Sequence, residues 1–296
     1  GGRAAARGPP GGACTRSARA SGPARALRRR WRRATGGPAT SPSGAARMAG
    51  GPTTAGLLGA VAAAGSLGFV PAGYRSAAQL ADDIAAARTA AGDVGVNLFV
   101  PEREPVDLDA VRRYRDLIAA EVEALGADMG PVVEDDDDAW DAKIDQLIRD
   151  PVPWVSFTFG LPDAATVRRL RRAGSRLLMT VTDLEEARAA CELDPDGLVV
   201  QSSAAGGHRG TFDQRRVPGT EDLVTLVRAV VGATDVPVVA AGGVSDATAV
   251  RAALDAGAEA VAVGTALLLA DEAGTRPTHQ SALADPRATS TTMRAY

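Results

Sequence analysis

Residues Val236–Thr265 read VPVVAAGGVSDATAVRAALDAGAEAVAVGT, and this stretch contains the unit from which the fold can be predicted. An apolar run ends in Gly242-Gly243, a helical pattern follows, and a second apolar run ends in Gly264-Thr265. Both runs lack the polar alternation of a half-exposed strand, which is typical of parallel strands buried on both faces. The stretch is therefore predicted to be a strand–helix–strand unit with parallel strands.

The same alternation extends back along the chain as far as Met48. The predicted strands are Leu67–Val70, Val94–Val100, Trp154–Phe159, Arg176–Thr180, Gly197–Gln201, Val236–Ala241 and Ala258–Gly264. Between them lie predicted helices at Pro52–Ala64, Ser76–Ala90, Asp107–Leu125, Ala139–Arg149, Asp163–Ala173, Asp183–Cys191, Thr220–Val231 and Asp246–Ala256. Alternating strands and helices indicate an α/β fold, and a (β/α)8 TIM barrel is our prediction.

A barrel of this kind needs one more strand than the sequence shows. The missing strand is expected before Met48, where residues 42–47 read PSGAAR. We therefore predict that the first strand is missing or corrupted. A doubly wound sheet is the alternative, but the G-x-G-x-x-G pattern that usually follows its first strand is absent.

Residues 1–47 differ in composition from the remainder, with 11 arginines and no Asp, Glu or Lys. Such a segment cannot bury enough apolar surface to fold, so we predict a disordered arm before a domain at 48–296. The run Arg28–Arg33 could bind nucleic acid or anionic lipid, or belong to a transit peptide. We favour the interpretation that the arm is GC-rich DNA translated upstream of the true start or outside the true reading frame. The chain has 32 arginines and one lysine, which suggests GC-rich codons. Nucleic acid is therefore not an expected partner.

Few cysteines and histidines are available for a metal or disulfide site. Cys14 and Cys191 are the only cysteines, which excludes a disulfide framework or a Cys-rich metal centre. His208 and His279 are the only histidines, so no metal site is expected.

Neither a membrane span nor an acidic ligand cluster is expected. The most apolar stretch, Gly56–Gly73, is mostly Ala and Gly and contains Pro71, so we expect a cytoplasmic protein. The acidic run Asp135–Asp138 precedes a predicted helix and is interpreted as a solvated helix start.

Functional residues of a TIM barrel lie at the C-terminal ends of its strands. The predicted strand 197–201 runs directly into SSAAGGHRG, residues 202–210, a glycine-rich turn that contains His208. Glycine lets the backbone approach a flat ligand, and a histidine at this rim can act as a general base. The alternative is a loop histidine without a role. Asn97, inside an apolar strand, either satisfies the backbone or contacts a ligand from the barrel mouth.

The glycine turns Gly242-Gly243 and Gly264-Thr265 follow the last two predicted strands. Many barrels bind phosphate in these two loops, through backbone N–H groups and a helix N-terminus. The pair of turns therefore predicts a phosphate site, with ordinary turn glycines as the alternative.

Six segments resemble those of a known family. They are MAGGP (48–52), GVNLFVP (95–101), SFTFGLP (156–162), AGGHRG (205–210), AAGG (240–243) and VGTA (263–266). Their order and spacing resemble the nitronate monooxygenases, formerly called 2-nitropropane dioxygenases, from Met48 to Tyr296. The Gly-Gly-His element is shared with flavin-dependent enoyl reductases, which are an alternative.

The resemblance implies a barrel that binds FMN and oxidises alkyl nitronates with O2 to a carbonyl compound and nitrite. It also implies that His208 removes the α-proton of neutral nitroalkanes. By the same matching, Gly242, Gly243, Gly264 and Thr265 would hold the FMN phosphate. The residues that would line the isoalloxazine and ribityl parts are Met48, Asn97, Gln201, Gly206 and Gly207.

The chain departs from the family pattern at three places. Ala262 stands where the family usually has Gln near the phosphate, and Arg47 precedes Met48 where the family has a strand ending in Ala-Pro-Met. The family continues beyond the position of Tyr296, so a truncated C-terminal extension is predicted. A non-catalytic, truncated remnant is therefore a further alternative.

Overall fold

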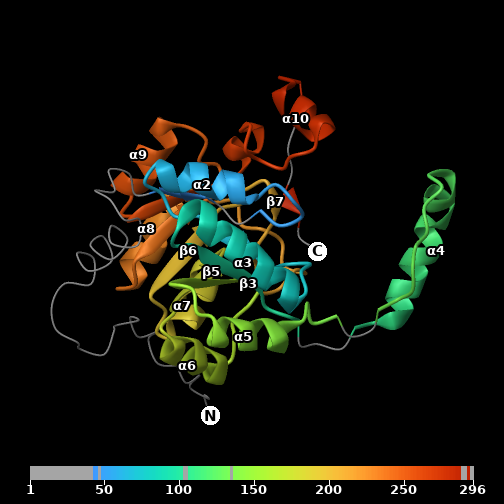
Figure 1. Ribbon diagram of the computed structural model, residues 1–296. Coiled ribbons are helices and arrows are strands. Elements are labelled where there is room, and N and C mark those ends of the chain that lie inside the picture. Colours follow the sequence, from blue (N-terminus) through green and yellow to red (C-terminus); the bar gives the residue numbers. More distant parts are fainter. Residues whose placement is uncertain (1–42, 46–47, 103–105, 134–135, 288–291, 294–296) are drawn as a thin grey trace, which may run out of the picture.

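The computed structural model describes residues 43–45, 48–102, 106–133, 136–287 and 292–293. Eight parallel strands form one sheet in the order β1-β9-β8-β6-β5-β4-β3-β2. A parallel bridge between Gly44 in β1 and Leu67, just before β2, joins the two ends of this order. The sheet therefore closes on itself with helices around it (Figure 1), which confirms the predicted TIM barrel.

The observed elements lie close to the predicted ones. The barrel strands are β1 Ser43–Ala45, β2 Phe69–Pro71, β3 Gly95–Phe99, β4 Trp154–Thr158, β5 Arg176–Val181, β6 Gly197–Gln201, β8 Val238–Ala241 and β9 Ala260–Val263. The helices are α2 Ala55–Ala63, α3 Ala77–Ala91, α4 Leu108–Ala124, α5 Trp140–Arg149, α6 Ala164–Ala173, α7 Leu184–Cys191, α8 Leu223–Ala233, α9 Ala247–Asp255, the 3-10 helix η1 Thr265–Leu269, and α10 Pro277–Ala284. A second sheet pairs β7, Gly207–His208, with β10, Thr292–Met293.

Strand β1 occupies the position for which the sequence showed no strand. Its three residues pair with β9 in the register Ser43↔Val261, Gly44↔Ala262 and Ala45↔Val263. The barrel thus begins within the segment that sequence analysis assigned to the arm before Met48. Ser-Gly-Ala has no large apolar side chain, so a strand held by its backbone gave no hydrophobic signal. The rest of the predicted arm, 1–42 and 46–47, lies outside the described residues.

Helix starts are set by side-chain caps. Asp163, Asp183 and Asp246 each accept a hydrogen bond from the backbone N–H three residues further on. The helix expected to begin at Thr220 begins instead at Leu223, because Asp222 provides the cap. An N-cap carboxylate satisfies an N–H group that has no partner within the helix.

Apolar side chains fill the barrel interior as well as the layer beneath the helices. The interior group contains Leu67, Phe69, Trp154, Leu178, Val199, Val239, Ala241 and Ala260. Gly95 makes room for Phe69, because a Cβ at this position would lie 2.3 Å from the Phe69 ring. The interior is therefore a packed core, and ligands are restricted to the mouth formed by the strand ends.

Helix α4 extends away from the barrel (Figure 1), and none of its residues is buried. The barrel mouth is consequently built without α4.

Among the described residues, no helix combines the length and the apolarity needed to cross a lipid bilayer.

An ion pair between a buried lysine and a partly buried aspartate lies at the rim of the barrel near the end of β2. The ammonium of Lys143, a residue only 1% exposed, lies 2.8 Å from Asp138 Oδ1. The same oxygen accepts a hydrogen bond from the N–H of Tyr74 at 2.9 Å, where φ is +64°. Burial raises the pKa of the Asp138 carboxyl above its usual range, although Lys143 opposes this shift.

Asp138 therefore differs from the solvated helix start that was expected of the acidic run. The residue faces inward because the only lysine of the chain needs a counter-charge once it is buried. Asp138 joins the start of α5 to the loop after β2, because it pairs with Lys143 and accepts from the N–H of Tyr74.

Asp138→Asn keeps an oxygen for the Tyr74 N–H but leaves the Lys143 ammonium buried without a counter-charge. We expect the free energy of unfolding to fall by about 3–5 kcal/mol, the usual effect of breaking a buried ion pair from one side. The double variant Asp138→Asn/Lys143→Met removes both charges and should recover most of the loss. Urea unfolding measures both changes. A single variant as stable as the wild type would contradict this role of the ion pair.

Candidate functional site

The loop after β6 is anchored by the side chain of Gln201. Its Nε2 donates to the carbonyl of His208 at 3.2 Å, and its Oε1 accepts from the N–H of Gly210 at 2.7 Å. Both ends of the amide are thus bonded to the loop. Gln201 was predicted to line a flavin, and the structure places it at the base of the loop that contains His208.

Gly210 brings this loop onto the ends of neighbouring strands. A Cβ at Gly210 would lie 3.0 Å from the methyl groups of Thr158, in β4, and Thr180, in β5. A side chain here would push the loop away from the strands. Because Gly210 has no side chain, the backbone can pack against the ends of β4 and β5. This packing places His208, two residues earlier, at the barrel mouth.

His208 stands at one end of a row of aromatic rings. Its ring lies edge-on to Phe159, with the centroids 6.4 Å apart. Phe159 packs against Phe99 at 4.8 Å, and Phe99 packs against Tyr74 at 5.7 Å. Both phenylalanines lie in segments that resemble the family, but the row itself was not predicted from the sequence. Their positions at the ends of β3 and β4 were the available signal.

Three loops meet where the sequence placed its glycine turns. A Cβ at Gly242 would lie 2.9 Å from the hydroxyl oxygen of Ser202, and a Cβ at Gly243 would lie 2.9 Å from Cβ of Ala204. Both glycines have positive φ, +90° and +73°. Gly206 faces the last loop, because its Cβ position is 2.9 Å from the hydroxyl of Thr265. The loops after β6, β8 and β9 are therefore in direct contact.

The backbone in these turns has unused hydrogen-bond donors. Within the described part of the chain, no acceptor is bonded to the N–H of Gly242, Gly243 or Thr265. Thr265 begins η1, where the first N–H groups have no acceptor within the helix. Backbone N–H groups without an acceptor are suited to binding an anion.

Met48 and Asn97 lie in different surroundings. Met48 packs in a small cluster with Leu57, Val61, Leu267, Ala270 and Ala273, which joins it to η1. Asn97 is 1% exposed, and its oxygen accepts hydrogen bonds from the hydroxyls of Ser156 at 2.8 Å and Thr158 at 3.0 Å. Met48 is thus close to the turn at Thr265, whereas the Asn97 oxygen is bonded to protein groups beneath the mouth.

Arg209, next to His208, is a buried charged residue at this site. It is 4% exposed, and its Nη2 donates to the carbonyl of Thr182 at 3.1 Å. Burial lowers the pKa of the Arg209 guanidinium below its usual value, while the carboxylates of Glu186 and Asp183 oppose this shift. The residue was part of the quoted AGGHRG segment, but its burial could not be predicted from the sequence.

Comparison with known proteins shows which family this chain belongs to. The family model described as nitronate monooxygenase matches residues 39–295, a range that includes β1. The chain belongs to the nitronate monooxygenase family. A probable nitronate monooxygenase of Staphylococcus aureus (strain MRSA252) is 33% identical over 248 residues, which are 82% of this chain and 69% of the relative. The predicted membership in this family of oxidoreductases is confirmed.

Solved structures agree with this assignment. A nitroalkane oxidase from Streptomyces ansochromogenes has a TM-score of 0.77 and 41% identity, covering 83% of this chain and 71% of that one. FabK from Thermotoga maritima has a TM-score of 0.61 and 24% identity, covering 82% and 63% of the two chains. The second likeness shows a common fold alone.

Gly242→Ala tests whether the loops are as tightly packed as the contacts indicate. Gly174, which ends α6, is the matched control, because its φ is +105° and nothing lies within 4 Å of its Cβ position. We expect Gly174→Ala to cost about 1 kcal/mol of backbone strain. Gly242→Ala should cost about 1–3 kcal/mol more, because the new methyl group also collides with its neighbours. Equal losses in urea unfolding would show that the loops are loosely packed.

Proposed function

We propose that this enzyme oxidises alkyl nitronates with O2 to a carbonyl compound and nitrite, using FMN bound at the barrel mouth. The observation that supports the proposal is the contact between the His208 loop and both glycine turns, in a chain of the nitronate monooxygenase family. The reaction balances without a further reductant when two nitronate anions and one O2 give two carbonyl molecules and two nitrite ions. The partners are thus small molecules, and the expected location in the cytoplasm stays a prediction.

The residues at the mouth fit FMN. The N–H groups of Gly242, Gly243 and Thr265, without acceptors among the described residues, suit a phosphate. Gly264 directly precedes Thr265 in the last turn. Gly207 leaves room for a flat ring, because nothing lies within 4 Å of its Cβ position. Gly206 and Met48 would complete the ribityl side. Bound FMN would supply the electron transfer between nitronate and O2.

His208 is proposed to be the base for neutral nitroalkanes. The imidazole would take the α-proton, and the electron pair of the broken C–H bond would move into the nitro group. The imidazolium that forms would then stabilise the negative charge on the nitronate oxygens. Phe159 lies edge-on to the imidazole, so one side of the base is covered by an apolar ring. A nitronate is already deprotonated and would not need this step.

Oxygen consumption by the FMN-loaded protein tests the function. We expect ethyl nitronate to support O2 uptake and nitrite release, and NADPH or NADH alone to support neither. Rapid bleaching of the flavin by NADPH or NADH would favour an enoyl reductase or another FMN reductase. A colourless protein that takes up no FMN in excess would favour the non-catalytic alternative.

Substitution of His208 separates the two substrates. His208→Asn should lower kcat/KM for neutral nitroethane by at least about 100-fold, the usual effect of losing a general base. The value for ethyl nitronate should fall much less, because no proton is removed. His279→Asn, at an exposed position of α10, removes the only other histidine and serves as the control. Equal losses for both substrates in His208→Asn would contradict the base role.

A further inference from the structure

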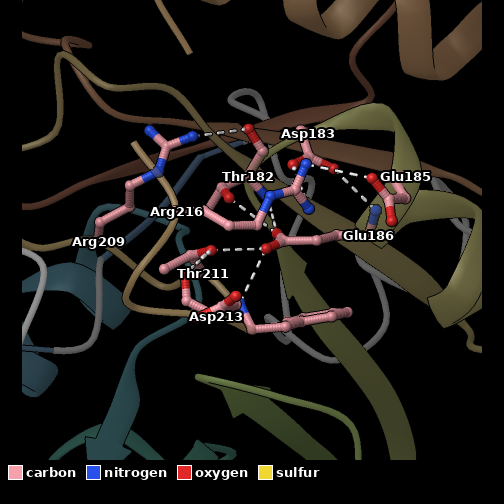
Figure 2. A network of polar contacts seen from close by, with 9 residues as sticks. Thr182, Asp183, Glu185, Glu186, Arg209, Thr211, Asp213 and Arg216 are labelled. Atoms are coloured by element: carbon pink, nitrogen blue, oxygen red, sulfur yellow. Dashed lines mark hydrogen bonds and ion pairs between the residues drawn. The ribbon is translucent and has the colours of Figure 1, made fainter. Parts of the chain in front are cut away.

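Glu186, in α7, has a buried carboxylate whose two oxygens are both fully used (Figure 2). The residue is 3% exposed. Oε2 accepts from the N–H and the hydroxyl of Thr182, at 2.6 and 2.8 Å. Oε1 accepts from the hydroxyl of Thr211 at 2.7 Å and from the N–H of Phe212 at 2.8 Å. Four donors around one carboxylate fix its position between α7 and the two segments that supply them.

These four bonds join two separate parts of the chain. Thr182 directly follows β5, whereas Thr211 and Phe212 belong to the segment that follows His208. The carboxylate therefore fastens the far end of the His208 loop to the end of a barrel strand. A carboxylate suits this position, because an acceptor-only group satisfies two backbone N–H groups and two hydroxyls together.

Arg209 fastens the same segment with the opposite charge. Its Nη2 bonds to the carbonyl of Thr182, the residue whose N–H and hydroxyl bond to Glu186. The other guanidinium nitrogen, Nη1, is buried and has no hydrogen-bond partner among the described residues. The carboxylates of Glu186 and Asp183 favour the charged form of this guanidinium and so oppose the lowering of its pKa by burial.

His208 lies between two anchors as a result. Gln201 bonds to its carbonyl from the β6 side, and separate bonds of Arg209 and Glu186 fix the residues after it from the β5 side. The geometry points to Glu186 as the positioning residue that keeps His208 where it can take a proton from the substrate. The four bonds of Glu186 go to Thr182, Thr211 and Phe212, so it would act on His208 through the loop. The inference rests on the proposed function in one respect, the role of His208 as a base.

Glu186→Gln changes this arrangement with little change of volume. The amide NH2 would face either the Thr182 pair of donors or the Thr211–Phe212 pair. The hydroxyl in that pair can rotate and accept from the amide NH2. The backbone N–H in the pair cannot accept, so it loses its hydrogen-bond partner. The change also removes the negative charge opposite Arg209. Glu185→Gln is the matched control, because Glu185 is the neighbouring residue, is exposed and, among the described residues, pairs with Arg216 alone at 3.1 Å.

The first readout is the ratio of kcat/KM for neutral nitroethane to kcat/KM for ethyl nitronate. In Glu186→Gln we expect this ratio to fall at least about tenfold, because a misplaced base slows only the substrate that must lose a proton. Glu185→Gln should keep the wild-type ratio. General loss of stability would lower both values by the same factor. An unchanged ratio in folded Glu186→Gln would overturn the inference.

The second readout does not depend on activity. The chain has two histidines, so the His208 ring signal in a carbon–proton NMR spectrum is assigned by comparison with His279→Asn. We expect this signal to shift or split in Glu186→Gln and to match the wild type in Glu185→Gln. A wild type inactive on both substrates would refute the proposed function, and the His208 signal would then decide the positioning role alone.

Thr211→Val is the milder variant if Glu186→Gln does not fold. It removes one hydroxyl donor and leaves the carboxylate in place. The ratio and the His208 signal should change in the same direction by smaller amounts. Wild-type values of both would overturn the inference.

Discussion

Close contact between the loops after β6, β8 and β9 is the constraint on which the site depends. The contacts are possible because Gly206, Gly242 and Gly243 have no side chains where a Cβ would collide with a neighbouring loop. Positive φ values at the last two would also strain any other residue. The same turns have backbone N–H groups without an acceptor among the described residues, so the loop packing and the proposed phosphate site depend on one feature.

Buried charges hold the mouth from two sides. Lys143 and Asp138 fix the backbone of Tyr74 near the end of β2, whereas Arg209 and Glu186 fix the loop near the end of β5. The aromatic row from Tyr74 to His208 connects the two groups. Buried ionic groups contribute little net stability, but they require one particular arrangement of the chain. Their value here is the position they impose on the residues at the mouth.

The fold alone does not establish the activity. FabK from Thermotoga maritima shares the barrel at 24% identity, and barrels of this type support many reactions by varying the loops at the strand ends. The family assignment narrows the choice to nitronate chemistry, and the packing around His208 indicates how the chain could perform it. The reaction of a barrel enzyme therefore depends on its loops, and the barrel supports them.

Local pattern in the sequence determined the repeating strand–helix order, the parallel barrel and the glycine turns, because continuous apolar runs and helical periodicity depend only on neighbouring residues. Tertiary structure alone decided the rest. Strand β1 is paired through its backbone and has no apolar signal. Asp138 pairs with buried Lys143 and accepts from the N–H of Tyr74, 64 residues earlier in the chain, and Gln201 bonds to its own loop. In the sequence Glu186 is one of several acidic residues at helix starts. Only the tertiary structure shows that Thr211 and Phe212 bond to it. Contacts between residues far apart in the chain have no local sequence pattern.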